Sequence, residues 1–232
     1  MTVTSNVTEY LTVDIIGNGI LSLAALGSFI YSLVRFFKPR GALYKKMVGC
    51  ALGCIFLERI YSIVQFIVAG ELTEIFQIGS FGNIGCFMFL FSANYGAFNS
   101  LIDDCSETLK KYRRIALAAP VFFIAAGVVI LLSPANLGRS ISCFIEEVLM
   151  GLSCYYSLKF LIIPKEYADI TTSLRPFHLL SLGLALTFTV ENILWVFDPE
   201  GSQYWIIIYI VSFLFIVALA PVLHRGIKKW KA

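Results

Sequence analysis

Residues 204–223 read YWIIIYIVSFLFIVALAPVL, twenty residues without a single charged side chain. At a rise of about 1.5 Å per residue, a helix of this length crosses the roughly 30 Å hydrocarbon core of a bilayer. Basic residues follow at once, at Arg225, Lys228, Lys229 and Lys231. An apolar span followed by a basic tail is typical of a last membrane helix whose C-terminus is cytoplasmic.

Six more apolar stretches of similar length precede this one. We place them at 13–36, 46–69, 76–102, 115–133, 140–163 and 176–197. The loops between them are too short to fold separately, so we expect residues 1–232 to form a single membrane domain. The predicted fold is an all-α integral membrane bundle of seven transmembrane helices.

The charged residues predict the orientation of this bundle. Sixteen of the eighteen Lys and Arg residues lie in every second polar segment: Arg35, Lys38, Arg40, Lys45, Lys46, Lys110, Lys111, Arg113, Arg114, Lys159, Lys165, Arg175, Arg225, Lys228, Lys229 and Lys231. The intervening segments carry mainly acidic residues, namely Glu9, Asp14, Glu71, Glu74, Asp198 and Glu200. The positive-inside rule then predicts an outside N-terminus and a cytoplasmic C-terminus. We expect a multi-pass protein of the plasma (inner) membrane.

Composition narrows the classes of function. Only 14% of the residues are charged and 58% are hydrophobic, whereas soluble domains are usually near a quarter charged. The basic residues of the predicted cytoplasmic segments account for the net charge of +3, so we expect no nucleic-acid partner. The six cysteines form no C-x-x-C pair and there are only two histidines. We therefore expect no bound metal and no other cofactor.

The first three and the last three predicted helices resemble each other. Glu58-Arg59-Ile60-Tyr61 in the second helix has a counterpart in Glu191-Asn192-Ile193-Leu194-Trp195 in the sixth. The two units, 13–102 and 140–223, would be parallel repeats, with 115–133 as a linker helix. Parallel repeats recur among secondary transporters, which bind substrate between them. The alternative is chance, because aromatic and aliphatic residues recur in any membrane span.

Several polar residues lie where the bilayer makes them costly. A charged side chain near the bilayer centre costs roughly 2.5–3.5 kcal/mol even on insertion-based scales. The candidate ligand-binding residues are Glu58, Arg59, Tyr61, Asn83, Asn94, Glu146, Glu147, Glu191, Asn192 and Trp195. Apart from Asn94, they belong to the outer half of the predicted bundle, and helical spacing gives their helices polar faces that must contact protein or water.

These residues allow two interpretations. An internal network that merely holds the helices together is one of them. It pairs Arg59 with one carboxylate but leaves three others to be protonated, hydrated or bound to a cation. We therefore favour a hydrated, acidic, aromatic-lined pocket open to the outside. The pattern leaves open whether Arg59 pairs with Glu58, Glu146, Glu147 or Glu191.

Enzyme chemistry finds little support in the sequence. Residues 204–223 contain no lysine that could bind retinal. The pair Glu146-Glu147 is similar to that of glutamate-type intramembrane proteases, but position 151 is Gly where that motif has Arg. No Gly-x-Ser-x-Gly elbow, P-loop or dinucleotide fingerprint is present. We therefore do not expect an enzyme.

Two families share features with this chain. The predicted 3+1+3 plan with an outside N-terminus is similar, over the whole chain, to the sugar-transporting and PQ-loop families, which implies a transporter. The stretch from Arg35-Phe36-Phe37-Lys38-Pro39-Arg40-Gly41 through Phe91-Ser92-Ala93-Asn94-Tyr95-Gly96, followed by Pro120, resembles the seven-helix sensor region of some bacterial histidine kinases. That resemblance covers the first half and implies a sensor module without its kinase.

The leading interpretation is a small-solute membrane transporter with an acidic, aromatic pocket in the outer half of the bundle. The alternative is a seven-helix ligand-sensing or partner-binding membrane module without its own output domain. Expected partners are the lipid bilayer, a small-molecule or cationic ligand, and a separate signalling or transport subunit. Transport also needs a polar path leading inward, for which Asn94, Asn99 and Tyr95 are the candidates.

Overall fold

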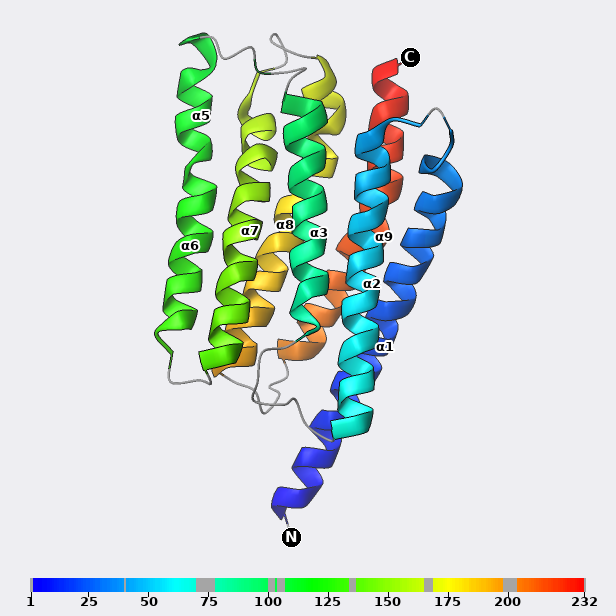
Figure 1. Ribbon diagram of the computed structural model, residues 1–232, viewed down its shortest axis with the longest axis vertical. Helices are drawn as coiled ribbons and strands as arrows, with labels where there is room; N and C mark the ends of the chain where they lie inside the picture. The colour runs from blue at the N-terminus through cyan, green and yellow to red at the C-terminus, as the bar shows by residue number, and fades with distance from the viewer. Residues whose placement is uncertain are drawn as a thin grey trace.

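The computed structural model is built from helices throughout the part of the chain that it describes (Figure 1). The described residues are 2–39, 41–69, 78–99, 103, 107–133, 137–164, 169–197 and 204–231. The elements are α1 Thr2–Phe36, α2 Leu43–Ala69, α3 Ser80–Ala93, the π-helix η1 Asn94–Asn99, the short 3₁₀ helix η2 Glu107–Leu109, α5 Lys110–Ala116, α6 Ala118–Leu131, α7 Leu137–Ile162, α8 Asp169–Phe197 and α9 Tyr204–Lys231. The predicted all-α class is confirmed for these residues.

Within the described residues, six helices are long and apolar enough to cross a membrane. They are Val13–Phe36, Leu43–Gln65, Glu107–Leu131, Leu137–Ile162, Ile170–Phe197 and Tyr204–Lys229. α3 is shorter, but η1 continues it, so that residues 80–99 form one further helical run inside the predicted stretch 76–102. The chain therefore has the architecture of an integral membrane protein.

Several helices extend beyond the predicted stretches, and α1, α8 and α9 extend the furthest. α1 begins at Thr2, α8 begins before Pro176, and α9 runs past Pro221 to its basic end. Prolines are tolerated inside membrane helices because neighbouring helices and local adjustments satisfy the freed backbone groups. The basic residues of α9 have good helix propensity, so the helix does not stop where hydrophobicity falls.

The fourth predicted stretch, 115–133, is divided at Leu117 into α5 and α6. Pro120 explains the break, because proline has no amide hydrogen and its ring crowds the carbonyl four residues earlier. The amide of Leu117 instead donates to the carbonyl of Arg114 at 3.2 Å, which tightens the local turn. Helix formation then resumes at Ala118.

The long helices pack in a ring. α1 contacts α2, which contacts α3; α3 contacts α7, and α8 and α9 then lead back to α1. α6 lies outside this ring against α7, at the edge of the molecule away from α1 (Figure 1). Two groups of three helices, α1–α3 and α7–α9, therefore meet along two interfaces, α3 with α7 and α1 with α9.

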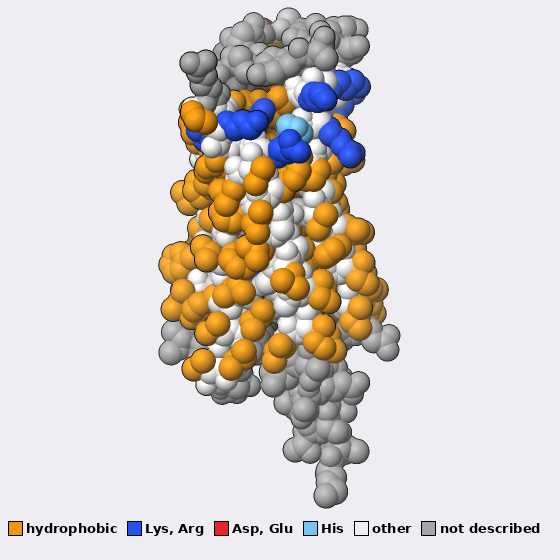
Figure 2. Space-filling model, turned by 90° about the vertical axis from the view of Figure 1, so that its right-hand side faces the viewer, with side chains coloured by type: hydrophobic (Ala, Val, Ile, Leu, Met, Phe, Trp, Pro, Cys, Tyr) orange, Lys and Arg blue, Asp and Glu red, His pale blue; other side chains and the backbone are white. Residues whose placement is uncertain are grey.

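On the face that Figure 2 shows, hydrophobic side chains cover the middle, and basic side chains gather near the end that carries the C-terminus. We call this end, which includes Arg35, Lys38, Lys45, Arg225 and Lys228, the basic end. A broad apolar belt with charge beyond it is the surface expected of a chain that spans a bilayer. The predicted acidic loop residues Glu71, Glu74, Asp198 and Glu200 lie outside the described residues.

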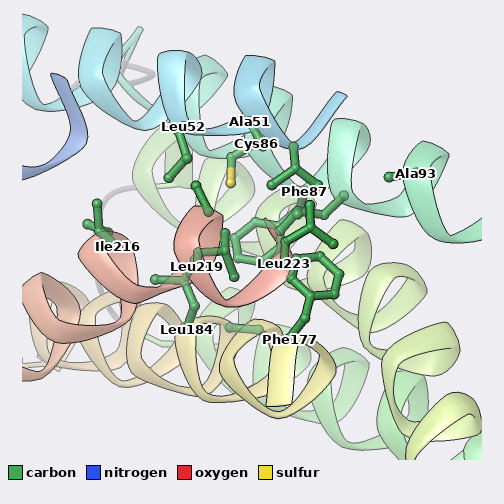
Figure 3. Close-up of a cluster of buried hydrophobic side chains, with 14 of the residues drawn as sticks. Ala51, Leu52, Cys86, Phe87, Ala93, Phe177, Leu184, Ile216, Leu219 and Leu223 are labelled. Carbon is green, nitrogen blue, oxygen red and sulfur yellow. The ribbon is translucent and has the colours of Figure 1, made fainter. Parts of the chain in front are cut away.

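A cluster of buried apolar side chains fills part of the ring's interior toward the basic end (Figure 3). Leu52, Phe87, Phe177 and Leu219 meet there from four different helices, and each is less than 2% exposed. Each of them lies nearer the basic end along its helix than the polar residues described next. Buried polar side chains, among them Asn94, also lie on this side.

Lys159 is a basic residue of the predicted cytoplasmic set that is buried. It lies near the end of the predicted stretch 140–163, belongs to α7 and is 2% exposed. Its ammonium group lies 3.1 Å from a carboxylate oxygen of Asp103. The sequence does not distinguish these arrangements, because a lysine near the end of an apolar stretch looks the same whether it faces the cytoplasm or a buried carboxylate.

Candidate functional site

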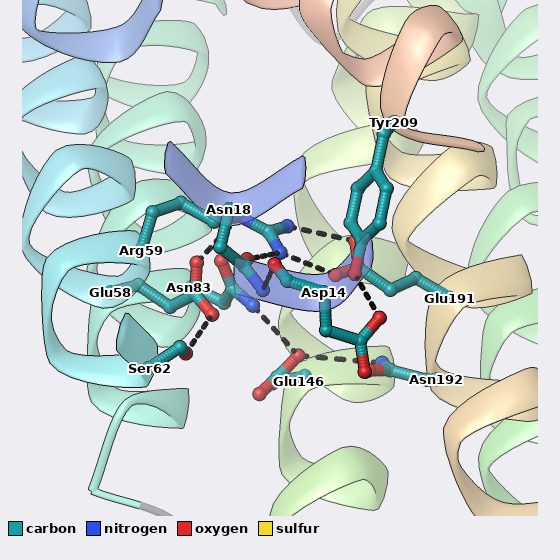
Figure 4. Close-up of polar contacts among 10 residues, drawn as sticks. All are labelled: Asp14, Asn18, Glu58, Arg59, Ser62, Asn83, Glu146, Glu191, Asn192 and Tyr209. Carbon is teal, nitrogen blue, oxygen red and sulfur yellow. Dashed lines mark hydrogen bonds and ion pairs between the residues drawn. The ribbon is translucent and has the colours of Figure 1, made fainter. Parts of the chain in front are cut away.

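Arg59 of α2 lies between two carboxylates (Figure 4). Its Nη1 and Nη2 donate to Oε1 and Oε2 of Glu191 at 2.5 and 2.8 Å, and its Nε lies 2.8 Å from Oε2 of Glu58. Nη1 also donates to Oδ1 of Asn18 at 3.0 Å, and the guanidinium lies 5.3 Å from the ring centre of Phe188. Arg59 is only 2% exposed. The structure thus selects Glu58 and Glu191 from the four partners that the sequence left open.

Glycine brings α3 close to this group. A Cβ on Gly82 would lie 2.7 Å from the carbonyl oxygen of Cys54 and would overlap the side chain of Glu58. Only a residue without a side chain permits this approach. The hydroxyl of Ser62 donates to Oε1 of Glu58 at 3.2 Å. α3 can therefore place its polar residues beside those of α2.

A second carboxylate pair lies on α7. Glu146 and Glu147 are 2% and 0% exposed. The amide nitrogen of Asn192 donates to both of them, at 3.3 and 3.0 Å, and the hydroxyl of Thr189 donates to Glu147 at 2.8 Å. The amide nitrogen of Asn83 lies 3.5 Å from Oε2 of Glu146. Two adjacent glutamates thus face α3 and α8 together.

Asp14 and Tyr209 complete the group where α1 meets α9. The hydroxyl of Tyr209 donates to Oδ1 of Asp14 at 2.9 Å. A Cβ on Gly17 would overlap the ring of Tyr209, so this glycine lets the tyrosine lie against α1. Asp14 is half-buried, and the side chain of Glu191 is 15% exposed. These two carboxylates form the more accessible edge of the group.

We call this group the acidic cluster. It comprises Asp14, Asn18, Glu58, Arg59, Ser62, Asn83, Glu146, Glu147, Thr189, Glu191, Asn192 and Tyr209. It contains five carboxyl groups and a single guanidinium. Because charges are costly away from water unless paired, such a group favours protons or bound cations. Within the described residues, no three His, Cys, Asp or Glu side chains are grouped to hold a metal ion.

Two of the sequence-predicted aromatic residues lie elsewhere. The indole ring of Trp195 lies 4.4 Å from the guanidinium carbon of Arg139, whose Nη1 also donates to the Trp195 carbonyl. Tyr61 is half-buried, close to Gly79 at the start of α3. The aromatic groups that contact the acidic cluster are instead Tyr209 and Phe188.

The cluster residues outside the predicted ligand-binding set are Asp14, Asn18, Ser62, Thr189 and Tyr209. Helical spacing could have found two of them, because Ser62 follows Glu58 by one turn and Thr189 precedes Asn192 by three residues. Asp14 precedes Asn18 by one turn but was assigned to an outer polar segment. Tyr209 carries no comparable signal, since tyrosines are common near the ends of membrane helices.

A second polar group follows α3 and α7 toward the basic end. The amide of Asn94 donates to the hydroxyl of Ser157 at 3.3 Å. Further along, Lys159 contacts Asn99 and Asp103, and Arg113 of α5 donates to Asp103 at 2.7 Å. We call these six residues the inner polar chain. Tyr95, also a candidate for an inward path, is 56% exposed, so its side chain does not belong to it.

The inner polar chain begins at an irregular part of the α3 run. Asn94–Asn99 form a π-helix, and π-helical segments occur frequently at functional sites. The wider turn changes the direction of the side chains that follow, and Asn99 contacts the ammonium group of Lys159. Asn94 itself is fully buried.

Comparison of the chain with protein-family models, with curated proteins and with solved structures finds no match. The acidic cluster and the inner polar chain are therefore the basis on which its function is inferred. Their residues come from all six helices of the ring, with a contribution from α5.

Proposed function

We propose that the protein is a small-solute membrane transporter whose binding site is the acidic cluster. All six ring helices contribute to that cluster, from Asp14 on α1 to Tyr209 on α9. A ligand bound there would contact both three-helix groups at once. Binding between two structural units is the arrangement used by secondary transporters with repeats.

The inner polar chain is the observation that carries this proposal. Transport requires polar groups on both sides of the binding site, and a sensor needs them only where the ligand enters. Along α3, Asn83 and Asn94 are eleven residues apart, which corresponds to about 16 Å of helix. From Asn94 the polar contacts continue through Asn99 and Asp103. Polar side chains therefore follow the α3–α7 interface over much of its length.

The ring arrangement supports a movement of one half against the other. The units α1–α3 and α7–α9 meet mainly along two interfaces, with smaller contacts such as those of α2 with α9 and of Arg59 with Glu191 on α8. The α3–α7 interface carries the inner polar chain, and the α1–α9 interface carries Asp14 with Tyr209. Rocking of one unit would open one end of these interfaces while closing the other. The apolar core of Figure 3 corresponds to closure toward the basic end.

The order of the helices around the ring also fits a duplicated 3+1+3 plan. In such a plan, α3 with α7 and α9 with α1 are equivalent contacts, and both occur. Glu58 and Glu191, the two residues matched by the repeat, both pair with Arg59. We propose that this shared pairing holds the two repeats together at the binding site. α6, which lies outside the ring, would be the linker.

A ligand-sensing module is the second candidate. The ion pairs among Asp103, Lys159 and Arg113 favour it, because they join α5 and α7 through Asp103 toward the basic end. A permanent lock there would leave the acidic cluster reachable from one side only. A separate signalling subunit would then read the state of the bundle.

Flux through reconstituted vesicles separates the two functions. A panel of amines, amino acids, sugars and alkali salts should be screened by electrical recording on supported membranes, with thermal stabilisation as the binding assay. For the solute so found, Asn94→Leu should abolish flux while binding stays within about twofold. Tyr95→Leu is the matched control, because this neighbouring side chain is exposed. Binding without accumulation under any imposed ion gradient would replace the transporter with the sensor.

A further inference from the structure

The acidic cluster consists of two parts that differ in how their charge is balanced. Arg59 lies between Glu58 and Glu191, so a guanidinium contacts both carboxylates. Glu146 and Glu147 form ion pairs with none of the lysines and arginines that the structure describes. The uncompensated charge is therefore concentrated on α7.

The neighbours of the α7 pair are neutral donors. Asn192 donates one amide group to both glutamates, and Thr189 donates to Glu147. These hydrogen bonds orient the carboxylate oxygens but supply no positive charge. Two adjacent carboxylates held in this way are a costly arrangement unless a proton or a cation accompanies them.

An amide oxygen beside this pair is also unsatisfied. Asn83 is 92% buried, since only 8% of its surface is exposed. Its nitrogen faces Glu146, and its Oδ1 has no hydrogen-bond partner within the described part of the chain. Asn83 lies between Glu58 and Glu146 (Figure 4). Buried polar atoms nearly always have a partner, so an acceptor left open beside two carboxylates points to a missing positive group.

We propose that Glu146, Glu147 and the amide oxygen of Asn83 form the binding site for a monovalent cation. The shared chemistry is a compact positive group that oxygen ligands can surround: a dehydrated alkali-metal ion or the ammonium group of an organic solute. Two carboxylates and one amide carbonyl supply oxygen ligands for one compact positive group. A divalent ion would require a larger set of ligands.

This inference rests on the proposed function, because the cation would be the transported solute or the ion coupled to it. The site bridges the two halves of the ring, since Asn83 belongs to α3 and both glutamates belong to α7. A bound cation would therefore stabilise one arrangement of the α3–α7 interface. The Arg59 group would position the helices around the site without taking part in cation binding.

Thermal unfolding of the purified full chain in detergent tests the site, with tryptophan fluorescence as the signal. Lithium, sodium, potassium and methylammonium chlorides are titrated at constant ionic strength against N-methylglucamine chloride, whose cation is too large for the site. We expect one of these four cations to raise Tm up to a plateau, by roughly 5–10 °C when its concentration is a hundredfold above Kd. A response to an alkali-metal ion would identify an inorganic ion as the ligand, and a response to methylammonium would identify an organic amine.

Variants locate the effect. Glu146→Gln and Glu147→Gln should each raise, at least tenfold, the cation concentration that gives half of the Tm increase. Asn83→Ala retains every charge and should raise this cation concentration by a factor of about three to ten. The test therefore remains decisive if a glutamate variant fails to fold. Glu107→Gln removes a carboxylate whose side chain is 83% exposed and should leave the response unchanged.

The cation site would be overturned if all five salts raised Tm equally. It would also be overturned if the Tm increase survived both Glu146→Gln and Asn83→Ala. The transporter proposal fails separately. Saturable cation binding without flux would reject transport and retain the site, whereas flux of a solute with no cation response would reject the site and retain transport.

Discussion

Arg59 of α2 and Glu191 of α8 form a two-point ion pair across the bundle, although 132 residues separate them in the chain. Both guanidinium nitrogens Nη1 and Nη2 donate to the carboxylate, at 2.5 and 2.8 Å. The fork of an arginine matches a carboxylate in this geometry, and lysine could not replace it. The pair links the two three-helix groups at the centre of the acidic cluster.

Removing Arg59 should therefore destabilise the protein more than removing Glu191. Arg59→Gln leaves the buried Glu58 and the partly buried Glu191 without a cation and should cost about 3–5 kcal/mol of unfolding free energy. Glu191→Gln leaves the guanidinium paired with Glu58 and should cost less. The double variant should be more stable than Arg59→Gln alone, because a single carboxylate then remains. The midpoint temperatures of thermal unfolding in detergent give the order of stability of these variants.

Arg35→Gln is the control for this series, since that side chain is exposed. It should change Tm by no more than one or two degrees. Equal Tm values for Arg59→Gln and Glu191→Gln would show that the charge of Arg59 is not what holds this region together.

Glu58→Gln should separate function from stability. Arg59 keeps its two bonds to Glu191 in this variant, so Tm should stay within a few degrees of the wild-type value. Uptake or ligand response should nevertheless be lost, because Glu58 lies beside Asn83 in the proposed binding site (Figure 4). A variant with low stability and full residual activity would show instead that Glu58 is structural, and Arg59→Gln should then rescue its stability.

Gly82→Ala should destabilise the packing of α3 against α2. The added Cβ would lie 2.7 Å from the Cys54 carbonyl oxygen and would overlap Glu58, and overpacking of this kind costs about 1–3 kcal/mol. Gly27→Ala on α1 is the matched control, because a Cβ at that position would have no neighbour within 4 Å among the described residues. That change should be neutral or stabilising by up to roughly 1 kcal/mol, since alanine favours helix. Similar losses of Tm for both variants would contradict the close approach at Gly82.

The inner polar chain predicts an asymmetry between its charged members. Asp103→Asn removes the carboxylate that lies 3.1 Å from the buried ammonium group of Lys159, whereas Lys159→Met leaves Asp103 paired with Arg113. Asp103→Asn should therefore be the more destabilising of the two, by about 3 kcal/mol or more relative to wild type. Lys110→Met, which breaks an exposed ion pair with Glu107, should change stability by less than about 0.5 kcal/mol. The reverse order in thermal unfolding would contradict the pairing.

Cysteine labelling tests the predicted orientation of the bundle. In a variant without native cysteines, single cysteines at Leu72 and Glu200 should react with a membrane-impermeant maleimide added to intact cells. Cysteines at Ala42 and Lys110 should react only after the membrane is permeabilised, because both lie near basic residues of the predicted cytoplasmic side. Labelling of Ala42 in intact cells would reverse the orientation. Expression of every variant is checked after permeabilisation.

Much of the fold could be predicted because its signals are local. Long apolar stretches such as 204–223 predict helices from composition alone, and the described residues are helical over almost all of these stretches. The break at Leu117 was readable in principle, because Pro120 cannot continue the preceding helix. The extension of α1 to Thr2 was not, because helix ends depend on contacts as well as on hydrophobicity.

The sequence alone determined which side chains must avoid lipid: Glu58, Arg59, Glu146, Glu147 and Glu191 are too costly to expose there. Only the tertiary structure decided how they pair. The choice of Glu191 for Arg59 depends on how each helix is rotated and how closely the helices approach, and these follow from packing between segments far apart in the chain. The same holds for Lys159, which the pattern placed near the cytoplasmic end of the stretch 140–163 and which packing places against Asp103. Hydrophobicity and helical period are properties of neighbouring residues, whereas a buried ion pair belongs to the packed bundle.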